Sequence, residues 1–222
     1  MIAVQGAREA GSPGREPRPV RLHDAGPAPN PRRVRIFLAE KGLSVPLVPV
    51  DLNRGEHRSP EFTALNPFQR TPVLEFDDGT ALSESLAICR YFEEVQPDPP
   101  LFGTGALGRA MVEMWHRRLE LTLFAAVAAV FRHTHPAMAP VEVPQLPDWA
   151  AANRPRVDAA LRLLDRHLAG RTWISGDTFT VADITGLVTL DLMRWARLTV
   201  PEELEAVQGW HERLKARPSA KA

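Results

Sequence analysis

The chain has 222 residues, of which 44% are hydrophobic and 24% charged, a composition typical of a globular protein rather than a disordered one. Its 27 basic and 27 acidic side chains cancel, so we expect neither nucleic acid nor a membrane surface as a partner. The only cysteine, Cys89, excludes a disulfide within the chain, and no segment has the apolar pattern of a signal peptide or a membrane span, so we expect a cytoplasmic protein.

Residues 1–19 carry glycine, proline and mixed charges without a hydrophobic period, and we expect them to form a disordered extension. From residue 20 to 96 the sequence alternates between strand and helix periods, which predicts an α/β domain. Asn30-Pro31 is typical of a helix cap followed by proline at the first helical position, and Gly42 is typical of a helix end. The elements expected in chain order are a strand at 20–23, a helix at 30–42, a strand at 47–51, a short helix at 59–66, a hairpin of 72–76 and 80–82, and a helix at about 83–96.

Residues 97–104 are predicted to be a linker, because Pro97-Asp98-Pro99-Pro100 cannot continue a helix. Residues 105–222 have a helical period throughout and are predicted to form an all-α domain. The sequence predicts three apolar helix faces there: Leu107, Met111, Trp115 and Leu119; Val157, Leu161, Leu164 and Leu168; and Leu204, Val207, His211 and Leu214.

The segment Thr180-Val181-Ala182-Asp183 has the spacing of a capping box, with aspartate in place of glutamate. Phe179 and Ile184 flank it as a potential hydrophobic staple. We interpret this segment as a structural helix start and assign it no chemistry.

The order β-α-β-α-β-β-α, with Thr71-Pro72 leading into the third strand, resembles the thioredoxin arrangement. In that fold the proline is cis, and the backbone of the residue before it faces a bound thiol peptide. The alternative is an ordinary proline at a strand entry. Where a thioredoxin carries C-x-x-C, this chain has Ala28-Pro29-Asn30-Pro31, which excludes dithiol redox chemistry at this place.

Four segments of the first domain resemble the glutathione-site segments of the cytosolic glutathione transferases. They are residues 30–42 (NPRRVRIFLAEKG), 55–62 (GEHRSPEF), 66–74 (NPFQRTPVL) and 82–88 (LSESLAI). Residues 180–184 (TVADI) also resemble the helix-start motif of the second domain in that family. The resemblance covers about residues 20–218 and is closest to a fungal and bacterial group that carries GEH-x-x-PEF. It implies the glutathione transferase fold, a thioredoxin-like domain followed by a helical one.

The resemblance implies that the γ-glutamyl end of glutathione binds at Glu84 and Ser85, next to Thr71 and Pro72. A hydroxyl and free N–H groups at a helix start can hold a carboxylate, and Glu84 can pair with an ammonium group. The alternative is a plain capping segment in which Ser83 is the cap.

Three cations of the first domain, His57, Arg58 and Arg70, are candidates for the glycyl carboxylate of glutathione. Each is alternatively a solvated surface charge. A metal site is not expected, because His133 and His135, two residues apart, do not share a helix face.

The group that would activate the thiol is not obvious. The larger transferase classes use Tyr, Ser or Cys near the first helix, and residues 22–31 contain none of these. In the fungal relatives, as the resemblance implies, a Ser and a His of the second domain hold an activating water, but the matching positions here are Ala128 and Arg132. Three contributors remain: the dipole of the first helix, the side chain of Asn30, and a cation from Arg132 or His133. His133 and His135 are alternatively loop histidines before a proline.

We therefore expect an enzyme that conjugates glutathione, as co-substrate, to small apolar electrophiles in detoxification, and that forms a homodimer as the family does. Two alternatives stay open. One is other glutathione-dependent chemistry on the same fold, such as isomerisation, dehalogenation or peroxide reduction. The other is a binding module that has kept the fold and lost catalysis.

Overall fold

The computed structural model describes residues 15–222, so most of the extension predicted at 1–19 lies outside the described residues. Strand β1 (Pro19–Asp24) starts at the last residue of that predicted extension. The elements that follow have the predicted order β-α-β-α-β-β-α and then helices, with one isolated bridge between Trp173 and Gly176. The predicted fold class, an α/β domain followed by an all-α domain, is confirmed.

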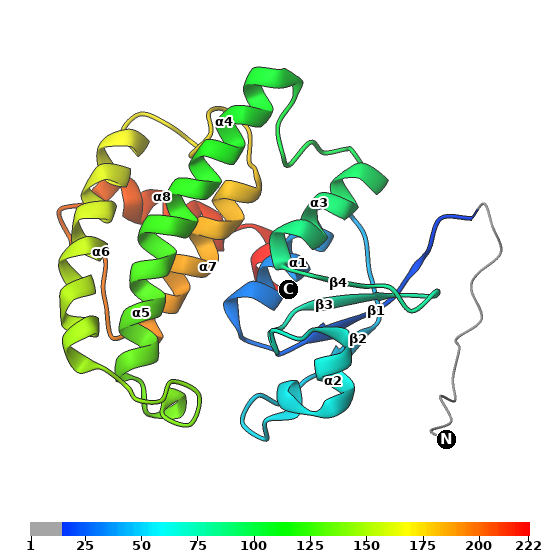
Figure 1. The fold of residues 1–222 in the computed structure, drawn as a ribbon. Coiled ribbons are helices and arrows are strands. Elements are labelled where there is room, and N and C mark those ends of the chain that lie inside the picture. Colours follow the sequence, from blue (N-terminus) through cyan, green and yellow to red (C-terminus); the bar gives the residue numbers. More distant parts are fainter. Residues whose placement is uncertain (1–14) are drawn as a thin grey trace, which may run out of the picture.

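Four strands form one mixed sheet in the order β2-β1-β3-β4 (Figure 1). Strand β2 (Leu47–Pro49) is parallel to β1, whereas β3 (Val73–Phe76) is antiparallel to both β1 and β4 (Ala81–Ser83). β3 and β4 are the predicted hairpin, and β2 is shorter than the strand expected at residues 47–51.

The helices divide between the two domains, with α1, α2 and α3 in the first and α4 to α8 in the second (Figure 1). Their bounds are α1 (Pro29–Glu40), η1 (Glu56–Arg58), α2 (Pro60–Leu65), α3 (Ser85–Val95), α4 (Gly105–Arg118), the π-helical segment η2 (Leu119–Phe124), α5 (Ala125–Thr134), η3 (Pro136–Met138), α6 (Pro147–Leu168), α7 (Val181–Trp195), α8 (Glu205–Lys215) and η4 (Pro218–Lys221).

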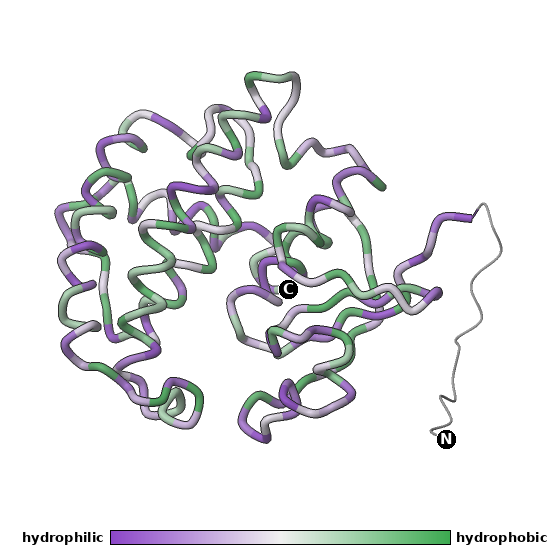
Figure 2. Tube along the Cα trace, viewed as in Figure 1, coloured by the Kyte–Doolittle hydropathy of each residue, from purple (hydrophilic) through white to green (hydrophobic). Residues whose placement is uncertain are grey.

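Different helices cover the two faces of the sheet. Side chains alternate along a strand, so Val73 and Leu74 of β3 point to opposite faces. Leu74 packs into the large core that includes α1 and α3, whereas Val73 packs with Phe62 of α2 in a smaller cluster. Figure 2 shows hydrophobic positions along the strands and mainly hydrophilic ones around α2 and on the outer side of α6.

Helices α4 and α5 form one long rod, because η2 joins them without a break in the helical backbone. The rod buries Val112, His116 and Leu119. The predicted face was wrong in its first two positions, since the side chains of Leu107 and Met111 are 77% and 37% exposed. No helix in the described part of the chain is both long and apolar enough to cross a membrane.

The start of α7 agrees with the prediction, whereas α1 begins earlier than predicted. The capping box at the start of α7 is confirmed, because Thr180 and Asp183 bond each other's backbone N–H groups. The first helix begins at Pro29 with Ala28 as its cap, so Asn30 lies inside the first turn rather than before it. Proline is favoured at the first position of a helix, and in α1 that position is occupied by Pro29 rather than by Pro31.

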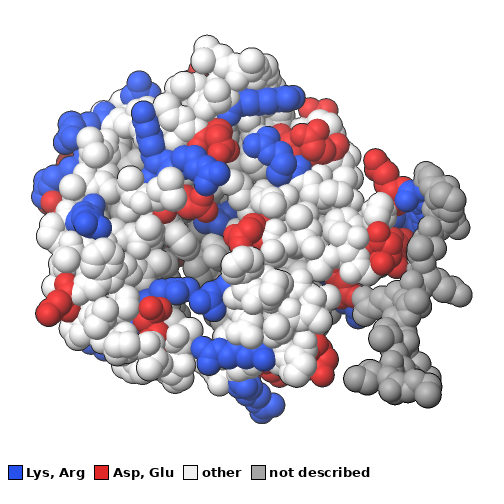
Figure 3. All heavy atoms as spheres, in the orientation of Figure 1, with Lys and Arg blue, Asp and Glu red and all other residues white. Residues whose placement is uncertain are grey.

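The two domains pack along α1 and α7 and share the main hydrophobic core, and a hollow lies between them on the face shown in Figure 3. Arg32 of α1 pairs with Asp191 of α7 at 2.6 Å. Arg217, near the C-terminus, donates two hydrogen bonds of 2.7 Å to the carboxylate of Glu40. These contacts join the C-terminal segment and α7 to the helix that begins at residue 29.

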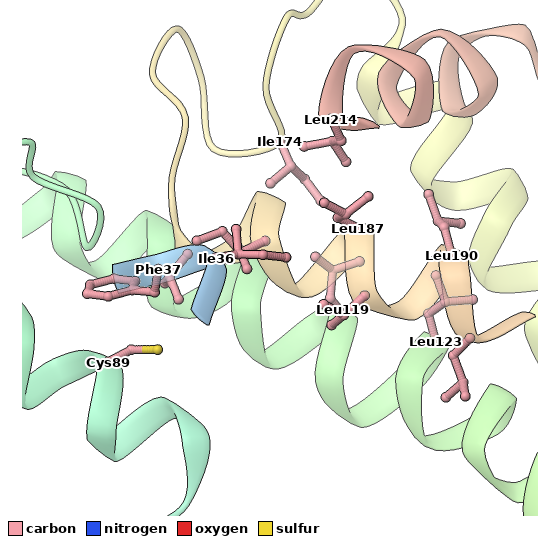
Figure 4. Close-up of a cluster of buried hydrophobic side chains, with 14 of the residues drawn as sticks. Ile36, Phe37, Cys89, Leu119, Leu123, Ile174, Leu187, Leu190 and Leu214 are labelled. Atoms are coloured by element: carbon pink, nitrogen blue, oxygen red, sulfur yellow. The ribbon is translucent and has the colours of Figure 1, made fainter. Parts of the chain in front are cut away.

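Helix α7 is the centre of the second domain. Figure 4 shows its Leu187 between Leu119 of the long rod and Leu214 of α8. One turn of α7 lies against an indole ring, since a Cβ added to Gly186 would be 2.1 Å from Cη2 of Trp210. Glycine is therefore required there for α7 and α8 to pack this closely.

Candidate functional site

The start of α3 brings together the two residues expected to hold a γ-glutamyl group. Ser85 is the first residue of α3 and is buried, and Glu84 is its cap and is exposed. Ser83 ends β4, so the alternative in which Ser83 caps the helix does not hold. The first N–H groups of a helix have no intrahelical acceptor, which makes this helix start suited to an anion.

The backbone of Glu84 has a conformation that is rare for a side-chain-bearing residue, with φ of +70° and ψ of 113°. Such strained residues persist where the surrounding structure holds them, and they cluster at ligand sites. Residue Gln69 also has a positive φ, of 54°. It lies close in sequence to the peptide bond between Thr71 and Pro72, which is cis as expected.

His57 lies in η1, before α2, and is only 4% exposed. Its Nδ1 has no hydrogen-bond partner among the described residues. Burial lowers the pKa of His57, and the nearby charges of Arg58 and Arg70 lower it further. The imidazole is therefore neutral at neutral pH and is available as a hydrogen-bonding group.

Cations of both domains lie near one another at the hollow between them. The pKa of Arg70 is lowered first by burial and then by the charges of Arg132 and Arg58, which places Arg132 of the second domain close to the first. Lys and Arg side chains gather at the lower rim of the hollow in Figure 3. Arg132 pairs with Glu142 at 3.3 Å, but no described carboxylate lies within ion-pair distance of Arg58 or Arg70.

His133 is engaged in the connection between α5 and α6. Its Nδ1 accepts a hydrogen bond of 3.1 Å from the backbone N–H of Leu146, and its Nε2 lies 3.8 Å from Glu142. His135 accepts a hydrogen bond from the N–H of Ala137 and caps η3. Both imidazoles thus have structural partners in this loop, as in the alternative interpretation of these residues. The described part of the chain holds no cluster of three or more metal-binding side chains.

The N-terminus of α1 presents few backbone donors. Pro29 and Pro31 have no N–H, and the N–H of Arg32 is bonded to the carbonyl of Ala28 at 3.1 Å. The N–H of Asn30 is therefore the one free backbone donor of this turn. Cys89 supplies no thiolate, because burial raises its pKa to about 12.

The sequence-based interpretation missed Arg33, which connects two of the predicted site residues. Its Nη1 donates to Asn30 Oδ1 at 3.0 Å and to Ser85 Oγ at 2.6 Å. The signal was an arginine on the apolar side of α1, next to Val34 and one turn before Phe37. The structure thus joins Asn30 and Ser85, which are 55 residues apart in sequence, through a single guanidinium group.

Two family models match the chain. Residues 28–95 match the glutathione S-transferase N-terminal domain, and residues 124–218 match the glutathione S-transferase C-terminal domain.

Known proteins match over almost the whole chain. Glutathione S-transferase 2 of Saccharomyces cerevisiae is 38% identical over 203 residues, which are 90% of this chain and 87% of the relative. A crystal structure of a glutathione S-transferase domain-containing protein from Marinobacter aquaeolei superposes with a TM-score of 0.86 at 39% identity, over 90% of this chain and 99% of that one. A shorter match, 50% identical over 80 residues, joins 35% of this chain to 38% of a maleylacetoacetate isomerase from Pseudomonas aeruginosa.

Proposed function

Because the chain belongs to the glutathione S-transferase family, and is thus a transferase with glutathione as co-substrate, we propose that it conjugates the glutathione thiolate to small apolar electrophiles. The observation that supports a functional site is the start of α3. A buried Ser85 and a strained Glu84 follow directly on the hairpin that begins with cis Pro72. That combination offers an anion site and a carboxylate next to the backbone of Thr71 and Pro72.

The γ-glutamyl end of glutathione binds at this helix start in our proposal. The hydroxyl of Ser85 and the free N–H groups of the first turn bind its α-carboxylate, and Glu84 pairs with its ammonium group. The backbone of Thr71, next to Pro72, bonds the central part of the peptide. The two charges of one amino-acid group are then recognised by opposite charges or dipoles within one turn.

The glycyl carboxylate of glutathione binds near His57, Arg58 and Arg70. Arg58 and Arg70 have no carboxylate partner among the described residues, and His57 has an unpartnered Nδ1. An anion bound there is attracted by the charge that these residues and Arg132 concentrate at one rim of the hollow.

The thiol lies at the start of α1, where the N–H and side chain of Asn30 are the donors in reach. A cation from Arg132 or His133 adds to the stabilisation of the thiolate across the hollow. The apolar electrophile packs against the side of the long rod that carries Phe124, Ala128 and Phe131, which are spaced for one helix face. Reaction then requires positioning of the two reactants and an activated thiolate.

The test is a pair of assays on the purified chain: retention on immobilised glutathione and turnover of glutathione with chlorodinitrobenzene. We expect both. Retention without turnover of this or any other electrophile would identify a binding module, and absence of both would reject the proposed site.

Glutathione-dependent isomerisation is the second candidate, favoured by the 50% identity over 80 residues to a maleylacetoacetate isomerase. Both reactions begin with the same glutathione thiolate, so they differ in the second substrate. Steady-state assays with cis-enone acids and with aryl halides separate the two by their kcat/KM values.

We also propose a homodimer that acts in cytoplasmic detoxification. The support for the dimer is an apolar groove of about 500 Å³ between the long rod and α6. Three of its lining side chains, Leu121, Trp149 and Leu163, are 66%, 45% and 61% exposed in the single chain. Light scattering on the chain and on Leu163→Glu tests it, with a dimer expected for the first and a monomer for the second.

A further inference from the structure

Arg33 is a buried cation with unused hydrogen-bond donors. Arg33 is only 1% exposed, and its side-chain nitrogens Nε and Nη2 have no hydrogen-bond partner among the described residues. No described carboxylate forms an ion pair with it, although Glu84 and Glu120 lie close enough to act on its charge. The ring of Phe124, from the second domain, lies 5.6 Å from its guanidinium carbon. A buried charge is costly unless it is paired, so this position calls for a reason.

The chemistry of guanidinium determines how its two partners are oriented. A guanidinium group has five N–H donors and no acceptor. The atom of Asn30 that faces Arg33 is therefore the carbonyl Oδ1, and the hydroxyl of Ser85 accepts through a lone pair. As a result the amide NH₂ of Asn30 and the O–H of Ser85 are left to donate to other groups.

We propose that Arg33 is a positioning residue that fixes Asn30 and Ser85 as hydrogen-bond donors toward two anionic groups of bound glutathione, the cysteinyl thiolate and the γ-glutamyl carboxylate. This inference rests on the proposed function, in which the thiolate lies at Asn30 and the γ-glutamyl carboxylate at Ser85. If residue 33 could also accept hydrogen bonds, Asn30 could turn its amide NH₂ toward it, and Ser85 could turn its O–H toward it. A donor-only partner removes that choice for both residues at once, and its positive charge attracts both anions.

The surroundings of Arg33 strengthen this assignment. His116 of α4 is fully buried beside it, and both of its ring nitrogens lack hydrogen-bond partners among the described residues, with Oε2 of Glu120 at 3.9 Å from Nδ1. The imidazole offers Arg33 no negative charge. The described neighbours of Arg33 therefore form no direct ion pair with it, and bound glutathione supplies negative charge on the side of Asn30 and Ser85.

The test uses Arg33→Gln, whose amide can accept as well as donate, with Arg32→Gln as the matched control. Arg32 is the adjacent residue of α1, and its guanidinium pairs with Asp191 and with the carbonyl of Ala220, away from Asn30 and Ser85. One readout is the affinity for S-methylglutathione by calorimetry, which reports the γ-glutamyl end without a thiol. The other is the pKa of the thiol of bound glutathione by ultraviolet titration.

We expect Arg33→Gln to weaken S-methylglutathione binding by about tenfold and to raise the thiol pKa by about half a unit or more. Arg33→Lys, which keeps the charge and also lacks an acceptor, should restore part of both losses. Arg32→Gln should change neither readout. In a Ser85→Ala background, Arg33→Gln should weaken S-methylglutathione binding less than about twofold further, because the two residues act together. Fully additive losses, or unchanged readouts in folded Arg33→Gln, overturn the proposal.

Asn30→Asp provides an answer that does not depend on the folding of an Arg33 variant. The new carboxylate still accepts from Arg33 but has no N–H to present, so the thiol pKa should rise at least as far as in Asn30→Ala. An unchanged thiol pKa in Asn30→Asp overturns the orientation that we infer.

Failure of the glutathione site and failure of the Arg33 proposal give different results. If Ser85→Ala and Asn30→Ala leave both readouts unchanged, the proposed glutathione site fails. If these two variants change the readouts and Arg33→Gln does not, only the role of Arg33 fails.

Discussion

The indole Nε1 of Trp210 on α8 donates a hydrogen bond of 2.9 Å to Oδ1 of Asp183 on α7, and both residues are fully buried. The same oxygen accepts from the N–H of Ile174 at 3.0 Å. Oδ2 accepts from the N–H and the hydroxyl of Thr180, both at 3.0 Å. Asp183 is thus more than a helix cap, because it connects α8, the start of α7 and the segment before it.

Asp183→Ala should lower the free energy of unfolding by about 3 kcal/mol or more, since each buried donor left without a partner costs roughly 1–3 kcal/mol. A simple cap is worth only about 0.5–2 kcal/mol. The measurement is urea unfolding at neutral pH. Asp158→Ala is the control, because the Asp158 side chain on α6 is half-exposed and pairs only with Arg162, and we expect a change of about 0.5 kcal/mol or less. Equal losses of unfolding free energy in the two variants would show that the buried hydrogen bonds of Asp183 stabilise the fold no more than a surface ion pair does.

The buried His116 predicts a specific acid sensitivity. Burial lowers its pKa to about 3, and the nearby cations Arg33, Arg117 and Arg90 act in the same direction. The unfolded chain binds the proton near pH 6.5, whereas the folded chain does not until about pH 3. His116 therefore carries no proton-linked penalty for folding above pH 6.5. Below that pH it lowers the free energy of unfolding by about 1.4 kcal/mol for each pH unit.

His116→Phe should remove this slope. The quantity to measure is the difference in unfolding free energy between variant and wild type at pH 7, 5.5 and 4.5, which should move in favour of the variant as the pH falls. A difference is needed because Asp183, whose pKa burial raises to about 6, changes stability in the opposite direction between about pH 6 and 4. His135→Gln, at a partly exposed loop position, is the matched control. Parallel profiles for wild type and His116→Phe would contradict the expectation.

The sequence predicts the local structure well where a few adjacent residues determine it. The helix start at Ser59, whose Oγ accepts from the N–H of Phe62 at 3.1 Å, and the capping box at Thr180 and Asp183 are examples. It fails where distant packing decides. Leu107 and Met111 share a helical period with Trp115, yet α4 turns Val112 and His116 inward.

The candidate site shows the same division. Glu84 and Ser85 could be singled out from a short motif, and the structure adds the positive φ of Glu84. The contact of Arg33 with Ser85 could not be predicted, because it depends on how α1 and α3 pack against each other. An arginine on an apolar helix face is visible in the sequence, but its partners are not.

Glu84→Ala and Ser85→Ala should each weaken glutathione binding by about tenfold to a hundredfold while the fold is kept. The reason is that both charges of the γ-glutamyl group need charge-assisted hydrogen bonds, each worth roughly 1.5–3 kcal/mol. Calorimetric titration with glutathione measures the loss, and melting curves check the fold. Glu94→Ala, an exposed acid toward the other end of α3, is the control and should bind as wild type does. Wild-type affinity in both site variants would mean that glutathione binds elsewhere.

The thiol of bound glutathione should be only partly activated, with a higher pKa than in transferases that supply a Tyr or Ser hydroxyl. Residues 22–31 contain no hydroxyl or thiol side chain. A helix N-terminus stabilises an anion by roughly 0.3–1 kcal/mol when exposed and by up to about 2 kcal/mol when partly buried. Here Pro29 and Pro31 leave Asn30 as the one free backbone donor of the turn, so the lower part of that range applies. Since one pKa unit corresponds to about 1.36 kcal/mol, the helix should lower the thiol pKa by about one unit or less.

A pH–rate profile of kcat/KM with an aryl halide, together with ultraviolet titration of the bound thiol, measures this pKa. Any further lowering of the thiol pKa must come from a side chain. Arg132 and His133 both lie near the carboxylate of Glu142, but only the His133 side chain also accepts a backbone N–H, so the two variants can be separated. Arg132 keeps one ion pair with Glu142, whereas His133 accepts from the N–H of Leu146 through Nδ1. Arg132→Ala should therefore raise the kinetic pKa, and His133→Ala should raise it less while loosening the α5–α6 connection. A thiolate fully formed below about pH 6.5 in wild type and unchanged by Arg132→Ala, His133→Ala and Asn30→Ala would require an activating group outside this set, since the helix supplies at most about one unit.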